Sequence, residues 1–217
     1  IILIEFPIFT DFNKDLVLMV GHLLLYHPAV RWMKKYIQEG GIGDLYAIYS
    51  QRLNLGRVRT TENAFWSLAP HDVSIMMYLA DSPVVKSSGV GRDFVNKGIE
   101  DFHFFSLEFE NGVLGHGHVS WLDPSKTRKF TIVGSKKMII FDDMLPTEKV
   151  KVFDKGVNEG EPLTLRDGEV FSPELDTTEP LKLECQHFLD SINNKTKPVS
   201  DGQNGLDVTK VMLEISP

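Results

Sequence analysis

The feature that most constrains this chain is a change in the spacing of its apolar residues near residue 84. From residue 84 to about residue 153, apolar side chains recur at every second position, which is the spacing of β-strands that bury one face. Segments in which they recur every three to four residues, as in helices, lie before and after this stretch. The pattern predicts an α+β fold, with a mostly antiparallel, open sheet of six or more strands and helices along one face.

The two central strands meet at Asn111-Gly112, a dipeptide typical of two-residue type I′ hairpin turns. Such a turn would pair Phe109 with Leu114. Under this register one face of the hairpin would carry His103, Phe105, Leu107, Phe109, Leu114, His116 and His118. We expect the three histidines to be satisfied polar groups of a partly buried sheet or of a subunit interface. A metal site is the weaker interpretation, because no cysteine or Glu-x-x-His spacing supports it.

The remaining elements follow from periodicity and from the residues that end helices. Further strands are expected at residues 44–54, 130–133, 138–141 and 150–153, and helices at residues 28–38, 62–79, 180–193 and 205–215. Pro70 lies inside the second helix, which therefore either kinks there or restarts with proline in its first turn. Residues 156–178 predict a long loop with at most one short hairpin. The apolar segments at residues 1–5 and 16–20 predict buried, parallel strands.

Length and charge narrow the class of protein. The chain has 217 residues, 42% of them apolar, and a formal net charge of −7, so it can bury a core but offers no overall basic surface for DNA or RNA. No apolar run approaches the roughly 18 residues of a membrane span. A single cysteine, Cys185, excludes an internal disulfide and fits a reducing compartment. We therefore expect a cytoplasmic protein that binds neither nucleic acid nor membrane.

Basic and polar side chains gather where the strand at residues 44–54 ends. The group consists of Arg52, Asn54, Arg57 and Arg59. Three arginines within eight residues of an acidic protein fit an anion site, because guanidinium groups bind phosphates and carboxylates through two parallel hydrogen bonds. The alternative is a solvated, charged loop. Lys126 and Arg128 are weaker candidates for the same site, since the start of a strand is an ordinary place for charge.

His71 is the candidate for acid–base chemistry. An imidazole titrates near neutrality, and His71 follows Pro70 near a kink or helix start, where a side chain can project into a cleft. Ser67, about one helical turn earlier, can orient a ligand but cannot act as a strong base. The alternative role of His71 is structural, in packing or capping the helix. Asp72 is expected to complement a helix N-terminus.

Several sequence blocks resemble the Gfo/Idh/MocA oxidoreductases over about residues 15–214. Residues 28–45 look like the helix-to-sheet crossover of that family. More specific are Gln-Arg-Leu-Asn-Leu-Gly-Arg-Val-Arg at residues 51–59 and Phe-Trp-Ser-Leu-Ala-Pro-His-Asp at residues 65–72. These two blocks resemble the branch that acts on UDP-activated N-acetyl-hexosaminuronic acids, the 3-dehydrogenases of bacterial surface-polysaccharide pathways.

The resemblance implies a function and a set of site residues. In the family a sugar hydroxyl is oxidised with NAD or NADP as hydride acceptor, and copies of the chain pair through the sheet into homo-oligomers. His71 would be catalytic, and a nucleotide-sugar substrate would be bound by Arg52, Asn54, Arg57, Arg59 and Ser67. Residues 5–7 resemble the Glu-Lys-Pro motif that ends a Rossmann strand, so the cofactor would adjoin Glu5, Pro7 and His22.

Two departures from the family pattern concern the cofactor. Phe6 stands at the position of the family's active-site lysine, and no Gly-x-Gly-x-x-Gly occurs in the sequence. We therefore expect residues 1–22 to be a short remnant of a Rossmann domain and residues 23–217 to form a substrate-binding and oligomerisation domain. This chain alone would then bind no NAD or NADP and would be inactive. The alternatives are a non-catalytic sugar-nucleotide-binding or assembly module that has lost redox activity, or a truncated copy of an ordinary enzyme.

Overall fold

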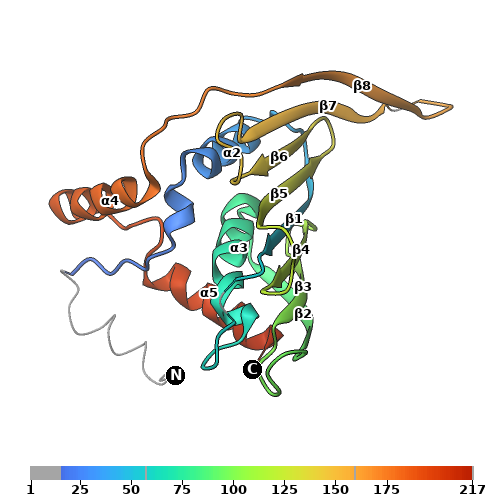
Figure 1. The fold of residues 1–217 in the computed structure, drawn as a ribbon. Coiled ribbons are helices and arrows are strands. Elements are labelled where there is room, and N and C mark those ends of the chain that lie inside the picture. The colour runs from blue at the N-terminus through green and yellow to red at the C-terminus, as the bar shows by residue number, and fades with distance from the viewer. Residues whose placement is uncertain (1–15, 57, 159, 217) are drawn as a thin grey trace.

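A computed structural model describes residues 16–56, 58–158 and 160–216 as one eight-stranded sheet with helices on one side of it (Figure 1). The strands are β1 (Leu45–Leu53), β2 (Val84–Arg92), β3 (Phe102–Phe109), β4 (Leu114–Ser120), β5 (Thr127–Gly134), β6 (Met138–Asp142), β7 (Val150–Asn158) and β8 (Thr164–Phe171). Their order across the sheet is β2-β3-β4-β1-β5-β6-β7-β8. Among the pairs in the described ranges, β1 and β4 run parallel and the others antiparallel. The predicted α+β fold is confirmed.

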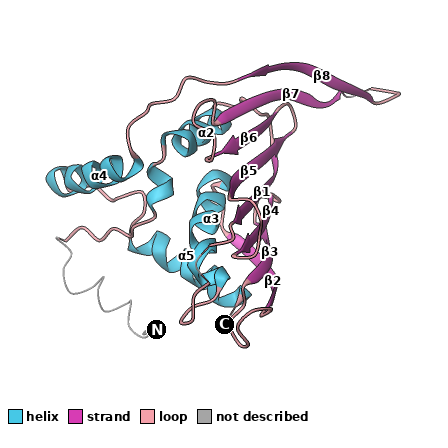
Figure 2. Cartoon of the chain, in the orientation of Figure 1, coloured by secondary structure: helices cyan, strands magenta, loops and turns pink. Residues whose placement is uncertain are grey.

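The helices pack on a single face of the sheet. They are the 3-10 turn η1 (Leu23–Tyr26) and the α-helices α2 (Pro28–Gln38), α3 (Ala64–Ala80), α4 (Pro180–Asn194) and α5 (Gly202–Ile215). Figure 2 shows α3 and α5 against the sheet and α4 standing away from it. The fully buried core lies between α3 and the strands, and includes Ile48, Phe65, Phe105 and Ile132.

Local signals explain where the helices nearest the site begin. The predicted helix at residues 28–38 is confirmed, with Pro28 in its first turn and the His27 ring accepting the Ala29 N–H at 3.1 Å. Helix α3 begins at Ala64 because the Asn63 side chain accepts the Trp66 N–H at 2.8 Å. The helix then continues through Pro70, which excludes the restart, one of the two alternatives for that proline.

The predicted register of the β3–β4 hairpin is wrong by one residue. The Gly112 N–H donates to the Phe109 carbonyl at 2.9 Å, and the Phe109 N–H donates to the Val113 carbonyl at 3.0 Å. Of Asn111 and Gly112, Gly112 alone has a positive φ, 84°, whereas a type I′ turn needs positive φ at both central residues. The loop therefore has three residues, and Phe105 pairs with Gly117.

This shift reverses the assignment of faces in the hairpin, because neighbouring side chains of a strand point to opposite sides. His103 is buried on the helix-covered face with Phe105. His116 and His118 lie on the open face, where the His118 ring contacts that of Phe104 with centroids 4.3 Å apart. The three histidines therefore do not share a face.

Two further expectations are corrected. Residues 16–20 form no ladder within the described chain: Met19 makes one isolated antiparallel bridge to Asp201, and Leu16 is 72% exposed. A strand needs a neighbour over its length to satisfy its backbone groups. The expected strand at residues 1–5 lies outside the described residues. The hairpin allowed within residues 156–178 is present but longer than expected, since β8 pairs with β7 over residues 152–171. Ion pairs across this hairpin, Arg166–Asp154 and Lys155–Asp167, both at 2.9 Å, hold a strand of low intrinsic propensity.

Candidate active site

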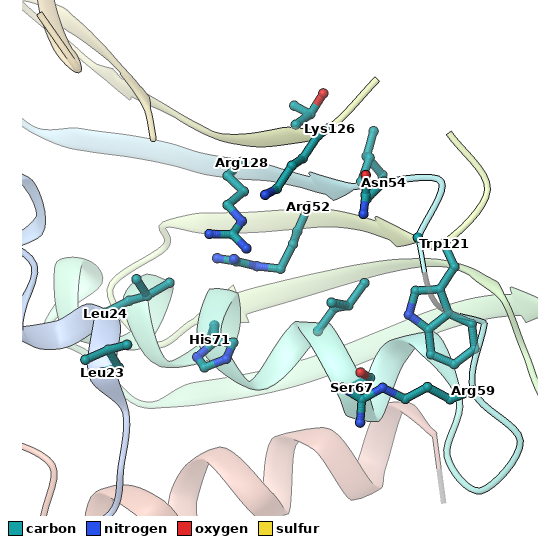
Figure 3. A pocket seen from close by; sticks show the side chains of 14 residues that line it. Leu23, Leu24, Arg52, Asn54, Arg59, Ser67, His71, Trp121, Lys126 and Arg128 are labelled. Carbon is teal, nitrogen blue, oxygen red and sulfur yellow. The ribbon is translucent and has the colours of Figure 1, made fainter. Parts of the chain in front are cut away.

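A cavity of about 420 Å³ opens where the ends of β1 and β5 approach α3 and η1 (Figure 3). Of the predicted site residues it is lined by Arg52, Asn54, Arg59, Ser67 and His71, together with Lys126 and Arg128. His22 is buried just before η1 and does not line the cavity. Arg57, Glu5 and Pro7 lie outside the described residues. The structure thus brings five of the predicted residues to one place, including both ends of the block at residues 52–71.

Secondary structure positions these side chains. Ser67 and His71 are four residues apart on α3, so they project from the same face of the helix. Arg52 of β1 is paired directly with Arg128 of β5, which places both guanidinium groups on the helix-facing side of the sheet. Figure 3 shows the Arg52 and Arg128 side chains extending from neighbouring strands over the helix that carries His71.

Arg52 is held by a buried carboxylate. Its Nε and Nη2 donate to Oδ1 of Asp72 at 2.8 and 2.6 Å, and Ser50 Oγ donates to Oδ2 at 3.1 Å. Asp72 is 0% exposed, and it lies within α3, so the prediction that it complements a helix N-terminus is wrong. Two of the five N–H donors of Arg52 are thus occupied, and of the three that remain for a ligand two belong to Nη1.

The environment of His71 keeps its ring neutral near pH 7. Burial lowers its pKa, and the positive charges of Arg52 and Arg128 lower it further, while Asp72 opposes them. Within the described residues, His71 Nδ1 is buried without a hydrogen-bond partner, so a ligand would have to meet the ring at Nε2. The pKa of the adjoining His22 is about 4, chiefly because the ring is buried and also because a protonated His71 would repel its positive charge.

The cavity carries an excess of positive charge although the chain as a whole is acidic. Arg59 forms an ion pair with Glu62, and Arg128 approaches Asp143 at 3.7 Å. Lys126 makes no ion pair with any residue that the structure describes. The cavity therefore suits a ligand with phosphate or carboxylate groups.

Part of the cavity lining is indicated only weakly, or not at all, by the sequence. Lys126 and Arg128 were weaker candidates, yet both line the cavity because β5 is the neighbour of β1 in the sheet. Leu23 and Leu24 of η1 form the apolar side of the cavity and were not predicted. A single 3-10 turn has no periodic signal in a sequence, so they could not be found in that way.

The described residues contain neither a metal-binding cluster nor a membrane-spanning helix. No group of three or more His, Cys, Asp or Glu side chains in ranges 16–56, 58–158 and 160–216 is arranged to hold a metal ion. In the same ranges, no helix combines the length and apolar character needed to cross a membrane.

Solved structures share this fold over nearly all of the chain. UDP-N-acetylglucosamine 3-dehydrogenase GnnA from Acidithiobacillus ferrooxidans superimposes with a TM-score of 0.77 at 20% identity, over 94% of this chain and 62% of that one. Levoglucosan dehydrogenase, solved with NADH, gives 0.75 at 17% identity, over 93% and 63%. Aldose-aldose oxidoreductase from Caulobacter crescentus, solved with glycerol, gives 0.74 at 15% identity, over 91% and 60%. The chain thus spans less than two thirds of the length of these structures. No curated protein sequence matched it.

Fold and cavity define an α+β domain with a cationic cavity at the ends of β1 and β5, two central strands of an open sheet. The family model of the GFO/IDH/MocA C-terminal domain matches residues 30–140, just over half of the chain. The chain therefore belongs to the GFO/IDH/MocA family, and the matched region contains Arg52, His71 and Arg128.

Proposed function

We propose that the chain is the substrate-binding part of an NAD(P)-dependent sugar oxidoreductase whose substrate is a nucleotide sugar acid of the UDP-hexosaminuronic type. The observation that carries this proposal is the pairing, in one cavity, of a neutral histidine with an excess of basic side chains. Support also comes from the family and from the UDP-sugar dehydrogenase among the structures with the same fold.

Each residue has a role in this proposal. Oxidation of a sugar carbinol needs a group that takes the hydroxyl proton. The neutral ring of His71 can accept that proton at Nε2, and the neighbouring Ser67 hydroxyl can orient the sugar. The charge of Lys126, which makes no ion pair with any described residue, would hold the carboxylate or phosphate groups of the substrate.

NAD or NADP, when bound, supplies the hydride acceptor. The described residues do not form a dinucleotide site by themselves. The sequence has no Gly-x-Gly-x-x-Gly, and within the described ranges His22, the one expected cofactor contact that can be placed, is buried and does not line the cavity. We therefore propose that the described residues supply the substrate side of the reaction.

A second candidate is a binding or assembly module that has lost redox activity, which is favoured by Phe6 at the position of the family's lysine. The two candidates agree on ligand binding. They differ in what His71→Ala does once a complete nucleotide-binding domain is supplied: it abolishes turnover in the first and changes nothing in the second.

Calorimetric titration with UDP-glucuronic acid tests the proposal. We expect saturable binding that Lys126→Ala weakens about tenfold, since a charge-assisted contact contributes about 1.4 kcal/mol or more. Lys129→Ala is the matched control, because Lys129 lies on β5 only three residues after Lys126 but does not line the cavity. Absence of binding at millimolar ligand, or equal losses in the two variants, would contradict the proposal.

A further inference from the structure

A second cavity of about 860 Å³ adjoins the first. Leu23, Leu24 and Arg128 line both cavities, so the two are neighbouring parts of one groove that passes along η1. Volumes of about 300–1,000 Å³ are usual for small-molecule sites, and each cavity alone falls in that range. The groove is therefore longer than a monosaccharide requires.

Three segments far apart in the sequence form the walls of the second cavity. They are the start of α2 at His27 and Pro28, the β6–β7 connection from Asp143 to Lys149, and residues 172–180. Residues 172–179 have no helix or strand and lead from β8 back to α4 (Figure 1). This segment is attached to the sheet where Ser172 Oγ donates to the Val150 carbonyl at 2.7 Å.

Arg128 lies where the two cavities meet, and its positive charge is only partly neutralised. Asp143 is already bound by Lys149 Nζ at 2.9 Å and by His27 Nε2 at 3.4 Å, whereas Arg128 Nη1 is 3.7 Å from it. The Arg128 side chain is 44% exposed. A guanidinium that is half exposed and only loosely paired can turn to a phosphate at the junction.

Most of the remaining polar lining of the second cavity has the opposite character, although Lys149 also lines it. This part consists of the carboxylates of Glu148, Glu174, Asp176 and Glu179 and the hydroxyls of Thr147, Thr177 and Thr178. Carboxylates accept hydrogen bonds and repel anions. This part therefore favours a neutral group that donates O–H and N–H hydrogen bonds.

We propose that the second cavity is a subsite for the nucleoside of a nucleoside diphosphate sugar, with the diphosphate at Arg128 and the sugar beside His71. The inference rests on the function proposed above and names how its substrate is divided along the groove. The ribose diol and the base N–H groups are the neutral donors that the carboxylates can accept. A free sugar acid would occupy the first cavity alone.

Three probes and two filling variants test this division by amide NMR titration. The probes are UDP, UDP-glucuronic acid and glucuronic acid, and the variants are Thr147→Trp and Thr177→Trp, each of which places an indole in the second cavity from a separate wall. We expect each variant to raise the Kd of UDP and of UDP-glucuronic acid at least tenfold while the Kd of glucuronic acid stays the same. Thr164→Trp, on the exposed hairpin outside both cavities, should leave all three unchanged.

The outcomes separate the two proposals. Unchanged UDP binding in both filling variants would overturn the subsite, while loss of binding in Lys126→Ala would still support the proposed function. Failure of UDP-glucuronic acid and glucuronic acid to bind the unmodified chain would overturn the proposed function instead. If NADH rather than UDP shifts the amides of residues 172–179, the cavity holds a cofactor nucleoside and the subsite proposal is wrong.

Discussion

Arg52 and Asp72 form a buried ion pair in which two guanidinium nitrogens donate to one carboxylate oxygen, at 2.8 and 2.6 Å. The pair joins the end of β1 to the interior of α3, next to His71. It also offsets the repulsion between Arg52 and Arg128, which are directly opposed on neighbouring strands. The pair therefore positions the helix that carries His71 and permits a cationic cavity at low energetic penalty.

The first prediction concerns this pair. Arg52→Ala leaves a buried carboxylate without its partner, so the free energy of unfolding should fall by about 3–5 kcal/mol. Adding Asp72→Asn to Arg52→Ala should recover part of the loss, because the uncompensated charge is then removed. Urea unfolding followed by circular dichroism measures both effects. A loss below about 1 kcal/mol would mean that the pair does not hold the helix to the sheet.

The second prediction concerns the proton affinity of His71. Because burial, Arg52 and Arg128 lower its pKa, NMR titration of the ring should give a value below the ordinary 6.5 of histidine. Arg128→Gln removes one of these charges and should raise the pKa toward that value. Lys129→Gln removes a charge outside the cavity and serves as the control. A pKa at or above 6.5 in the unmodified chain would show that the ring is not the neutral base proposed here.

The third prediction concerns stability in acid. The pKa values of His22 and His103 lie at about 4 in the folded chain, chiefly because both rings are buried. Between pH 6.5 and 4 the unfolded chain therefore binds more protons than the folded one, and stability falls as the pH falls. The free energy of unfolding should fall by up to about 1.4 kcal/mol per pH unit for each of the two histidines.

His103→Leu tests that slope. Below pH 6.5 the unfolded chain should then bind one proton fewer in excess of the folded chain. Urea unfolding at intervals of half a pH unit measures this as a shallower fall in the free energy of unfolding. Above pH 7 His103 is neutral in both the folded and the unfolded state. There the plots of unfolding free energy against pH for His103→Leu and for the unmodified chain should run parallel. The same acid slope in both chains would exclude His103 as a source of the effect.

The fourth prediction concerns the open face of the sheet. Tyr49, Phe104 and Leu114 are exposed there beside His116, and no helix in the described part of the chain covers them. We predict that two copies pair through this face with two-fold symmetry and bury more than about 1,200 Å² in total. Light scattering at tens of micromolar should give a dimer mass at neutral pH, and Leu114→Lys should reduce it. A monomer mass for the unmodified chain would refute the pairing.

Protonation of His118, which lies on that face, should weaken the pairing in acid, and because burial lowers its pKa the effect should appear below the ordinary 6.5 of histidine. His103 has no part in this effect, since the corrected hairpin register turns it to the core. The apparent mass measured between pH 7.5 and 5.5 checks it. A mass that does not change over this range would show that histidine protonation has no effect on the pairing.

Local sequence signals were enough for much of the fold but not for its long-range pairings. Helix α2 could be predicted to the residue because Pro28 begins it and Gly40-Gly41 follow its end. The register of the β3–β4 hairpin could not be predicted, because Asn-Gly suits loops of two and of three residues. The φ of Asn111 is positive in the two-residue type I′ loop, and the sequence does not reveal it. The Asn111 side chain accepts the Val113 N–H at 3.2 Å and donates to the Ala80 carbonyl at 3.0 Å, and Ala80 belongs to the end of α3.

The candidate site shows the same division. Ser67 and His71 share a helix face, so their proximity follows from spacing alone. Arg128 meets Arg52 only because β5 is the neighbour of β1, an arrangement set by the sheet order. The ion pair between Arg52 and Asp72 depends on the packing of α3 against β1. The spacing of residues along the chain does not predict it.

The most direct test of the account is to follow the His71 ring by NMR while UDP-glucuronic acid is added to the purified chain. The account predicts a saturable shift of the His71 signals, with a dissociation constant that rises about tenfold in Lys126→Ala and stays constant in Lys129→Ala. A ring that does not respond at millimolar ligand, while the chain remains folded, would contradict the claim that His71 and the basic side chains form one substrate site.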